Sequence, residues 1–275
     1  MSAPGPDPWR HLAARTPARI ALGRAGASLP TREVLAFALA HAQARDAVHA
    51  RLDRQRLRSD LSAAGLVEDV HLLVDIESQA TDRETYLRRP DLGRRLNEAS
   101  RAALAGMPRG PFDLAILIGD GLSATAVARH APAFLAAFLP HVRRLALRLG
   151  PICLAGGARV ALGDEVGACV GAPAIAVLIG ERPGLSAPDS LGVYLTYQPR
   201  IGRTDAERNC LSNIRPGGLS PEVAAFKLAW LVETALTRRL TGVALKDESD
   251  AALPAQAARL RLSARRRRGQ RRAKS

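Results

Sequence analysis

The sequence predicts an α/β protein: a Rossmann-like, mainly parallel sheet with flanking helices, plus a small helical unit at the N-terminus. Two observations lead to this fold class. Short runs of apolar, mostly branched residues end in glycine-rich turns, as at Leu114–Ile118 and Ile175–Ile179, which is typical of strands buried on both faces. Helical patterns lie between these runs, and strands that alternate with helices pair in parallel.

The N-terminal part is predicted to be helical after a flexible arm. Residues 1–29 are rich in Pro, Gly, Ala and Arg and form the expected arm. Thr31 is placed to cap a helix. The apolar residues that follow helical spacing are Val34, Leu35, Leu39, Val48 and Leu52. This pattern continues with breaks toward Gly65, so residues 30–68 are predicted to form a helical unit.

Residues 69–245 are predicted to form the α/β domain. The expected strands are Val70–Ile76, Leu114–Ile118, Ile152–Leu154, Ile175–Ile179 and an alternating edge strand at Val193–Tyr197. The expected helices are Asp91–Gly106, one capped by Ser123 and kinked or restarted near Pro132 and Pro140, Asp164–Val170, and Pro221–Arg239 capped by Ser220.

Positive charge is concentrated at the C-terminus. The formal net charge is +14 at pH 7, and residues 251–275 hold nine Lys and Arg but no Asp or Glu. Removing these nine charges leaves +5 for the first 250 residues, so most of the chain is only mildly basic. An Arg-rich end is typical of a solvated tail, and residues 246–275 are predicted to be disordered. Nucleic-acid binding is therefore not expected.

Cysteine usage and hydropathy point to the cytoplasm. The three cysteines, Cys153, Cys169 and Cys210, show no C-x-x-C spacing, so neither a disulfide framework nor a zinc site is expected. No run approaches ~18 consecutive apolar residues, and the N-terminus lacks the apolar core of a signal peptide. We expect a cytoplasmic protein without membrane contact.

Three expected strands end in glycine next to an acidic residue or a second glycine. These ends are Gly119–Gly121, Gly156–Gly157 and Gly180–Glu181, and in a parallel sheet they meet at one edge. Each glycine by itself is explained by a tight turn between strand and helix. Together on one edge they favour a ligand site, because glycine lets the backbone approach a ligand closely. Asp120 and Glu181 are the expected hydrogen-bond acceptors there.

No catalytic or metal-binding group emerges from the sequence. Arg208 and Arg215 would lower the pKa of a Cys210 thiolate, but no histidine lies nearby to make it a nucleophile. His71 lies in a segment like the Asp-x-His-x-x-Gly signature of cobalamin proteins, with Val74 in place of glycine, and is interpreted as structural. Asp164 and Glu165 are adjacent, so they are expected at a helix N-terminus and not as an acid–base pair.

Several blocks resemble the small subunit of ethanolamine ammonia-lyase. The two most specific are Gly180-Glu-Arg-Pro-Gly-Leu185 and Cys210-Leu-Ser-Asn-Ile214. The others are Asp120-Gly-Leu-Ser123, Gly163-Asp-Glu-Val-Gly167, Asp189-Ser-Leu191 and Gly217-Gly218. The resemblance covers about Pro30 to Gly242 and leaves out both ends of the chain.

The resemblance implies an adenosylcobalamin-dependent lyase that converts ethanolamine to acetaldehyde and ammonia by radical chemistry. In that family a large barrel subunit holds the substrate and carries the catalysis, while the small subunit completes the cofactor pocket. By motif position, the implied cobalamin contacts are Val160, Glu181 and Cys210. The family also implies a hetero-oligomer, free in the cytoplasm or enclosed in a bacterial microcompartment.

Two rival hypotheses remain. A free-standing Rossmann-like nucleotide-binding enzyme would need a Gly-x-Gly-x-x-Gly turn, and Gly119-Asp-Gly121 lacks the third glycine. A nucleic-acid-binding protein would owe its affinity to the Arg-rich tail, and that affinity would fall steeply with salt.

Overall fold

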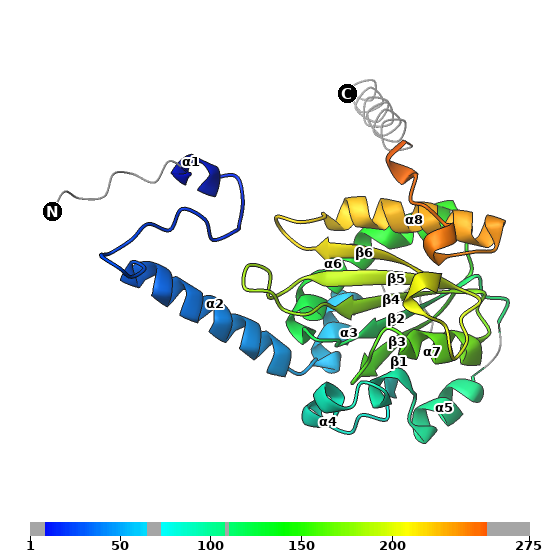
Figure 1. The fold of residues 1–275 in the computed structure, drawn as a ribbon. Coiled ribbons are helices and arrows are strands. Elements are labelled where there is room, and N and C mark those ends of the chain that lie inside the picture. Colours follow the sequence, from blue (N-terminus) through cyan, green and yellow to red (C-terminus); the bar gives the residue numbers. More distant parts are fainter. Residues whose placement is uncertain (1–8, 65–72, 108–109, 252–275) are drawn as a thin grey trace, which may run out of the picture.

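The protein forms a six-stranded sheet with helices on both faces (Figure 1). The computed structural model describes residues 9–64, 73–107 and 110–251. His71, residues 65–72 of the expected N-terminal unit and first strand, and most of the Arg-rich tail lie outside the described residues.

The described strands are β1 (Leu73–Glu77), β2 (Leu114–Gly119), β3 (Leu149–Gly156), β4 (Ala174–Gly180), β5 (Leu191–Tyr197) and β6 (Arg208–Ile214). The described α-helices are α1 (Arg10–Ala13), α2 (Thr31–His49), α3 (Arg54–Ala63), α4 (Arg83–Arg88), α5 (Glu98–Ala105), α6 (Ala124–Arg144), α7 (Leu162–Val170) and α8 (Pro221–Arg238). Short 3₁₀ turns lie at Leu92–Arg94, Asp205–Glu207, Gly242–Ala244 and Ser249–Ala251.

The strand order is β1-β3-β2-β4-β5-β6. The first four strands in this order pair in parallel, whereas β5 is antiparallel to both of its neighbours. The predicted mainly parallel sheet is thus confirmed. The carboxyl ends of β2, β3 and β4 also meet at one edge, as expected from their sequence.

The prediction that Val193–Tyr197 forms an edge strand is wrong, because β6 pairs with it on its outer side. The sequence does not predict β6 as a strand. Its buried residues Arg208, Leu211 and Ile214 are separated by polar or exposed residues, so it lacks the apolar run that marks the inner strands.

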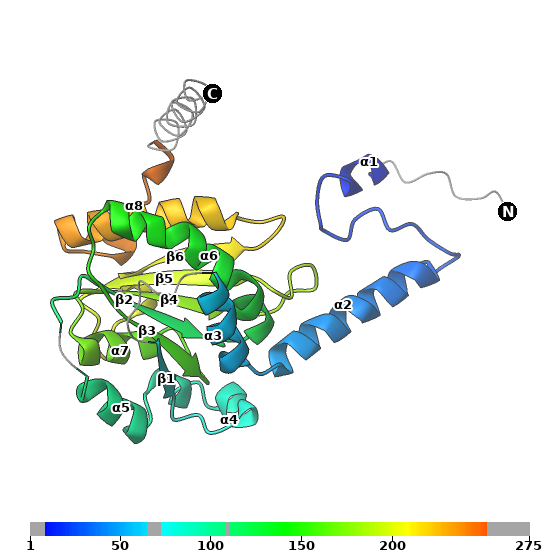
Figure 2. The same ribbon diagram turned by 180° about the vertical axis from the view of Figure 1, so that it is seen from behind.

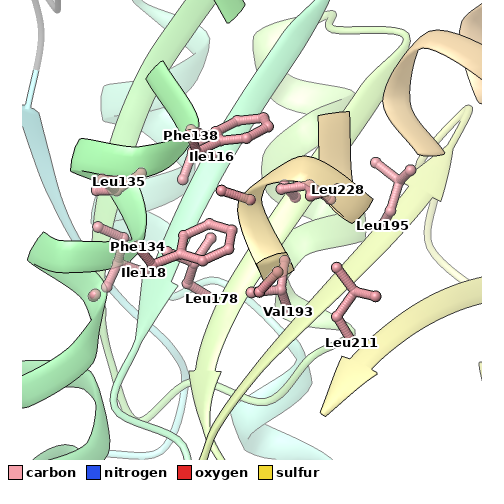
Figure 3. Close-up of a cluster of buried hydrophobic side chains, with 14 of the residues drawn as sticks. Ile116, Ile118, Phe134, Leu135, Phe138, Leu178, Val193, Leu195, Leu211 and Leu228 are labelled. Atoms are coloured by element: carbon pink, nitrogen blue, oxygen red, sulfur yellow. The ribbon is translucent and has the colours of Figure 1, made fainter. Parts of the chain in front are cut away.

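The larger core lies between the sheet and the helices α6 and α8. Phe134 and Phe138 of α6 stack with ring centroids 5.9 Å apart, and both are fully buried. Figure 3 shows them beside Ile118, Leu178 and Val193 of the sheet. Burial of apolar side chains such as these is the main stabilising contribution to a domain of this kind.

The opposite face of the sheet is only partly covered. A second apolar cluster forms where α5 and α7 pack on β1, β2 and β4. On the β5–β6 part of this face, Tyr194 stays half-buried, and Cys210 and Ser212 are exposed. This uncovered corner lies next to the carboxyl end of β4.

Most of the predicted helices are confirmed, with three corrections. Ser123 and Ser220 accept the expected capping hydrogen bonds, but Thr31 is the first residue of α2 and not its cap. Helix α6 runs without a restart through Pro132 and Pro140, because burial of its apolar face compensates for the lost backbone hydrogen bonds. The expected helix at Asp91–Gly106 divides into the 3₁₀ turn Leu92–Arg94 and α5, with Asn97 as the cap of α5.

The predicted N-terminal helical unit is formed by α2 and α3. Figures 1 and 2 show α2 projecting from the body of the protein, while α3 packs beside the sheet. The predicted first helix is confirmed and ends at His49. Of the apolar residues with helical spacing, Val34, Leu35 and Leu39 are exposed, whereas Leu52, beyond the helix end, packs against the larger core.

Candidate functional site

A groove of about 420 Å³ lies at the carboxyl end of β4 and against the uncovered face of β5 and β6. Its lining residues come from helix α4, the turn after β2, the turn after β3, the end of β4 with the loop after it, and strands β5 and β6. They are Tyr86, Gly121, Leu122, Arg159, Val160, Ile179, Gly180, Glu181, Arg182, Tyr194 and Ser212. Two of the three residues predicted from the sequence, Val160 and Glu181, therefore meet at one groove.

Glu181 follows β4 directly, and its carboxylate reaches across β5 to β6. The Ser212 hydroxyl donates to Oε1 at 2.6 Å, and the Asn213 backbone N–H donates to Oε2 at 3.1 Å. The Ser190 hydroxyl also donates to Oε2. A carboxylate can accept about four hydrogen bonds, so Oε1 keeps capacity for one further donor. The side chain is thus held in one orientation at the wall of the groove.

Gly192 of β5 makes this path possible. A Cβ atom at this position would lie 2.9 Å from Glu181 Oε1. Real Cβ atoms do not approach an oxygen this closely, so any side chain here would displace the carboxylate. The glycine therefore serves the close approach of Glu181 to the sheet.

Val160 lies half-buried in the turn between β3 and α7. Its carbonyl accepts the Gly163 N–H at 3.0 Å, which fixes the backbone of the turn. A carbonyl oxygen has two lone pairs, so this one can accept a second hydrogen bond. The turn begins at Gly157, whose φ of +63° lies in the left-handed region that glycine adopts readily.

Cys210 lies beside the groove, paired across the strands with Tyr194. Partial desolvation of its sulfur raises the pKa of the thiol, a hydrogen bond with Tyr194 opposes this effect, and the negative charge of Glu181 adds to it. A raised pKa keeps the thiol protonated at neutral pH, so Cys210 is no activated nucleophile. The raised pKa therefore gives no support to a covalent role for Cys210.

Arg208 and Arg215 do not lower the pKa of Cys210, contrary to the expectation from their proximity in sequence. The Arg208 guanidinium is buried and donates to both oxygens of Asp164 at 2.6 and 2.7 Å. Burial alone would lower the pKa of Arg208, but the paired hydrogen bonds to Asp164 raise it. Arg215 donates to the Asn213 side chain at 2.7 Å.

Asp164 and Glu165 lie in the first turn of α7, as predicted, and each binds a different arginine. Glu165 accepts from the Leu96 N–H at 2.9 Å and from Arg101 Nε at 2.7 Å. Asp164 is the partner of Arg208. The two carboxylates therefore join α7 to β6 and to α5, and they do not form an acid–base pair.

The turn after β2 is closed by Asp120. This carboxylate accepts the backbone N–H groups of Gly121, Gly157 and Ala158 at 2.9, 3.1 and 2.8 Å. It also lies 3.8 Å from Nη1 of Arg83. Burial raises the pKa of Asp120, and these N–H groups oppose that effect. Asp120 thus ties the turns after β2 and β3 together.

The glycines of these turns pack against the protein itself. A Cβ at Gly121 would lie 2.3 Å from the Gly180 carbonyl oxygen, and one at Gly180 would lie 2.0 Å from the Ser123 carbonyl oxygen. A Cβ at Gly156 would meet the Glu77 carboxylate. The structure therefore supports the tight-turn interpretation for these three glycines, and the groove is lined mainly by side chains.

The sequence does not predict two residues of the groove, Tyr86 and Arg159, or their neighbour Arg83, which lies outside the groove lining. The two guanidinium groups lie over the Tyr86 ring, 4.7 and 4.2 Å from its centroid. The Tyr86 hydroxyl donates to the Ala158 carbonyl at 3.1 Å. Nε of Arg159 is buried and has no hydrogen-bond partner among the described residues. No local motif marks these residues, because the cluster forms only when α4 meets the turn after β3.

Beside this cluster lies a second cavity of about 220 Å³ at the carboxyl ends of β1, β2 and β3. Tyr86 lines both cavities and separates them.

In the described ranges, no group of three or more His, Cys, Asp or Glu side chains could hold a metal ion. None of the helices in the part of the chain that the structure describes is long and apolar enough to cross a membrane.

The fold and groove define an α/β protein with an open groove at the carboxyl end of its parallel strands. Hydrogen-bond acceptors and an exposed sheet face surround this open groove, and none of its lining residues is His or Cys. Residues 6–246 match the family described as "Ethanolamine ammonia-lyase light chain (EutC)". The chain belongs to this family.

Curated relatives agree with this assignment. The chain is 58% identical over 243 residues to an ethanolamine ammonia-lyase small subunit of Bradyrhizobium diazoefficiens, covering 88% of this chain and 91% of the relative. It is 56% identical over 240 residues to one of Rhodopseudomonas palustris, covering 87% and 90%. It is 53% identical over 256 residues to one of Xanthomonas campestris, covering 90% and 91%. The named relatives are subunits of ammonia-lyases.

Proposed function

We propose that this chain is the small subunit of an adenosylcobalamin-dependent ethanolamine ammonia-lyase, which converts ethanolamine to acetaldehyde and ammonia. In this proposal a large subunit holds the substrate and carries the catalysis. The present chain covers one side of the cofactor, which it contacts through Val160, Glu181 and Cys210. The enzyme works in the cytoplasm or within a bacterial microcompartment.

The observation that carries the proposal is the gathering of these three positions around one groove. Val160 and Glu181 line it, and Cys210 lies next to its lining residues Tyr194 and Ser212. The three positions come from the turn after β3, the end of β4 and the middle of β6, which lie far apart in the sequence. A site assembled from three separate segments is what a ligand-binding edge of an open α/β sheet requires.

The donor set of the groove fits the rim of a corrin. That rim carries amide side chains, which offer both N–H donors and carbonyl acceptors. Glu181 Oε1 and the Val160 carbonyl can accept from such amides. At about 420 Å³ the groove is far smaller than a corrin, so this chain can contact only one side of the ring.

The chain's own task in this enzyme is to hold, orient and shield the cofactor. When bound, adenosylcobalamin supplies the organic radical that abstracts hydrogen from the substrate. The hydrogen bonds to Glu181 fix the position of one acceptor for the amides of the corrin rim. The aromatic ring of Tyr194 excludes water from the adjoining sheet face. No residue of this chain is assigned a catalytic role.

The proposal is tested by cobalamin binding to the complex of this chain with the large subunit of the same enzyme. Loss of the Glu181 carboxylate in Glu181→Ala should weaken cobalamin binding at least about tenfold, because hydrogen bonds to a charged group contribute about 1.5–3 kcal/mol. Glu233→Ala, which removes an exposed carboxylate on α8, is the matched control and should bind normally. Unchanged cobalamin affinity in Glu181→Ala would remove Glu181 from the site.

A second measurement tests the assignment of roles to the subunits. The isolated chain should show no lyase activity, and addition of the large subunit with adenosylcobalamin should restore turnover. Turnover of ethanolamine by the isolated chain would contradict the proposed function.

A further inference from the structure

The outer face of α2 carries a continuous apolar stripe. Successive residues of a helix lie about 100° apart, so Val34, Leu35, Ala38, Leu39 and Ala42 share a stripe about 140° wide. Val34, Leu35 and Leu39 are exposed at 50%, 64% and 60%. The buried residues of this helix are three alanines on its opposite side: Ala40, Ala44 and Ala47.

Such a stripe is costly to leave in water. Burying a leucine side chain contributes about 1.5–3 kcal/mol, and contiguous exposed apolar surface usually marks an interaction site. In Figures 1 and 2, α2 stands clear of the sheet and its covering helices over most of its length. The described part of the chain therefore does not cover the stripe.

The shape of the stripe favours a large globular partner over a second copy of this chain. A two-stranded coiled coil uses a narrow seam that repeats over three or four heptads. Helix α2 has 19 residues, and its stripe ends at Ala42 before the charged residues Arg45 and Asp46. A broad, short apolar stripe is the kind that a helix presents to the core of a globular protein.

The position of α2 indicates which globular partner this is. Arg83 donates to the Val48 carbonyl near the end of α2 at 2.6 Å and to the Gly121 carbonyl at the groove at 2.7 Å. In Figures 1 and 2, α2 leaves the body of the protein on the side that holds the carboxyl ends of the parallel strands and the loop between β4 and β5. A protein that faces the groove therefore also has α2 within reach.

We propose that the apolar stripe of α2 docks into the large subunit of the lyase and anchors this chain beside the cofactor. The inference rests on the proposed function, since it takes its partner from there. The helix would act as an arm that is inserted into an apolar groove of the large subunit, while the groove at the carboxyl end of β4 meets the cofactor.

The test is co-elution of the full-length chain with the large subunit in size-exclusion chromatography with light scattering, followed by titration of the dissociation constant. Leu35→Asp and Leu39→Asp should each weaken binding of the large subunit at least about tenfold, as expected for anchor residues of an interface. The matched control is Val243→Asp, which changes an apolar residue that is 82% exposed on the body of the protein. It should bind the large subunit like the wild type.

The outcomes separate the docking proposal from the proposed function. If wild type and both α2 variants bind the large subunit equally well, the docking proposal is wrong and the proposed function stands. If the wild type does not bind the large subunit at all, the proposed function fails. If the isolated wild type is a dimer and Leu35→Asp is a monomer, the occupant is a second copy of the chain and the docking proposal is overturned. Far-ultraviolet circular dichroism should show unchanged helix content in every variant.

Discussion

The turn after β2 and the loop after β4 look alike in sequence but play different roles. Each places a carboxylate beside a glycine at the carboxyl end of an inner strand, Asp120 in the first and Glu181 in the second. Asp120 is 8% exposed, and it binds backbone N–H groups of two turns. Glu181 is half-buried and binds mostly side-chain hydroxyls at the wall of the groove. The hydrogen-bond partners of a carboxylate, and not its sequence motif, therefore distinguish a residue that ties turns together from one that lines a groove.

The largest effect is expected from a substitution of Asp120 in the turn after β2. Asp120→Ala leaves the N–H groups of Gly121, Gly157 and Ala158 without their acceptor, at about 1–3 kcal/mol for each buried group. We expect the free energy of unfolding to fall by at least about 3 kcal/mol in urea titration. Glu181→Ala should cost less, about 1 kcal/mol, because its partners Ser212 and Asn213 are exposed and can bind water, and only Ser190 is buried. Equal losses of unfolding free energy in the two variants would show that the turn after β2 and the loop after β4 do not differ in their structural role.

The strands and helix caps of this fold could be predicted because their signals are local. Apolar runs mark β2 and β4. A serine directly before each helix, Ser123 or Ser220, marks the starts of α6 and α8, because its side chain accepts the backbone N–H three residues later. The strand β6 could not be found in this way, because its buried positions are separated by polar or exposed residues and form no apolar run. Its role as a strand depends on pairing with β5.

The candidate site was predictable only as a place in the fold. The end of β4 and the turn after β3 could be assigned to one edge, since parallel strands place their carboxyl ends together. Tyr86 and Arg159 could not be found, because they meet through contacts between α4 and a turn more than 70 residues later in the chain. Nor could the sequence show that Arg208 turns away from Cys210 to the buried Asp164.

A smaller effect is expected when the second region is changed without touching its carboxylate. In Gly192→Ala the new Cβ would lie 2.9 Å from Glu181 Oε1, so the carboxylate must move away from Ser212. Cobalamin affinity of the complex should fall about fivefold, since a weakened hydrogen bond costs about 1 kcal/mol. The control is Gly184→Ala in the loop between β4 and β5, where the nearest atom to an added Cβ is 3.8 Å away. If Gly192→Ala binds cobalamin like the control, the orientation of Glu181 does not matter.

The smallest effect is expected on the reactivity of the Cys210 thiol when the negative charge of Glu181 is removed. This charge raises the pKa of the Cys210 thiol, so Glu181→Gln should lower that pKa and increase the thiolate fraction at pH 8. Alkylation of Cys210 by iodoacetamide should then be roughly twofold faster than in the wild type, as expected for a partly screened charge. Mass spectrometry of the Cys210 peptide separates it from Cys153, for which burial raises the pKa to about 12. The control Glu233→Gln should leave the rate unchanged, and an equal rate in Glu181→Gln would place the charge of Glu181 away from the sulfur.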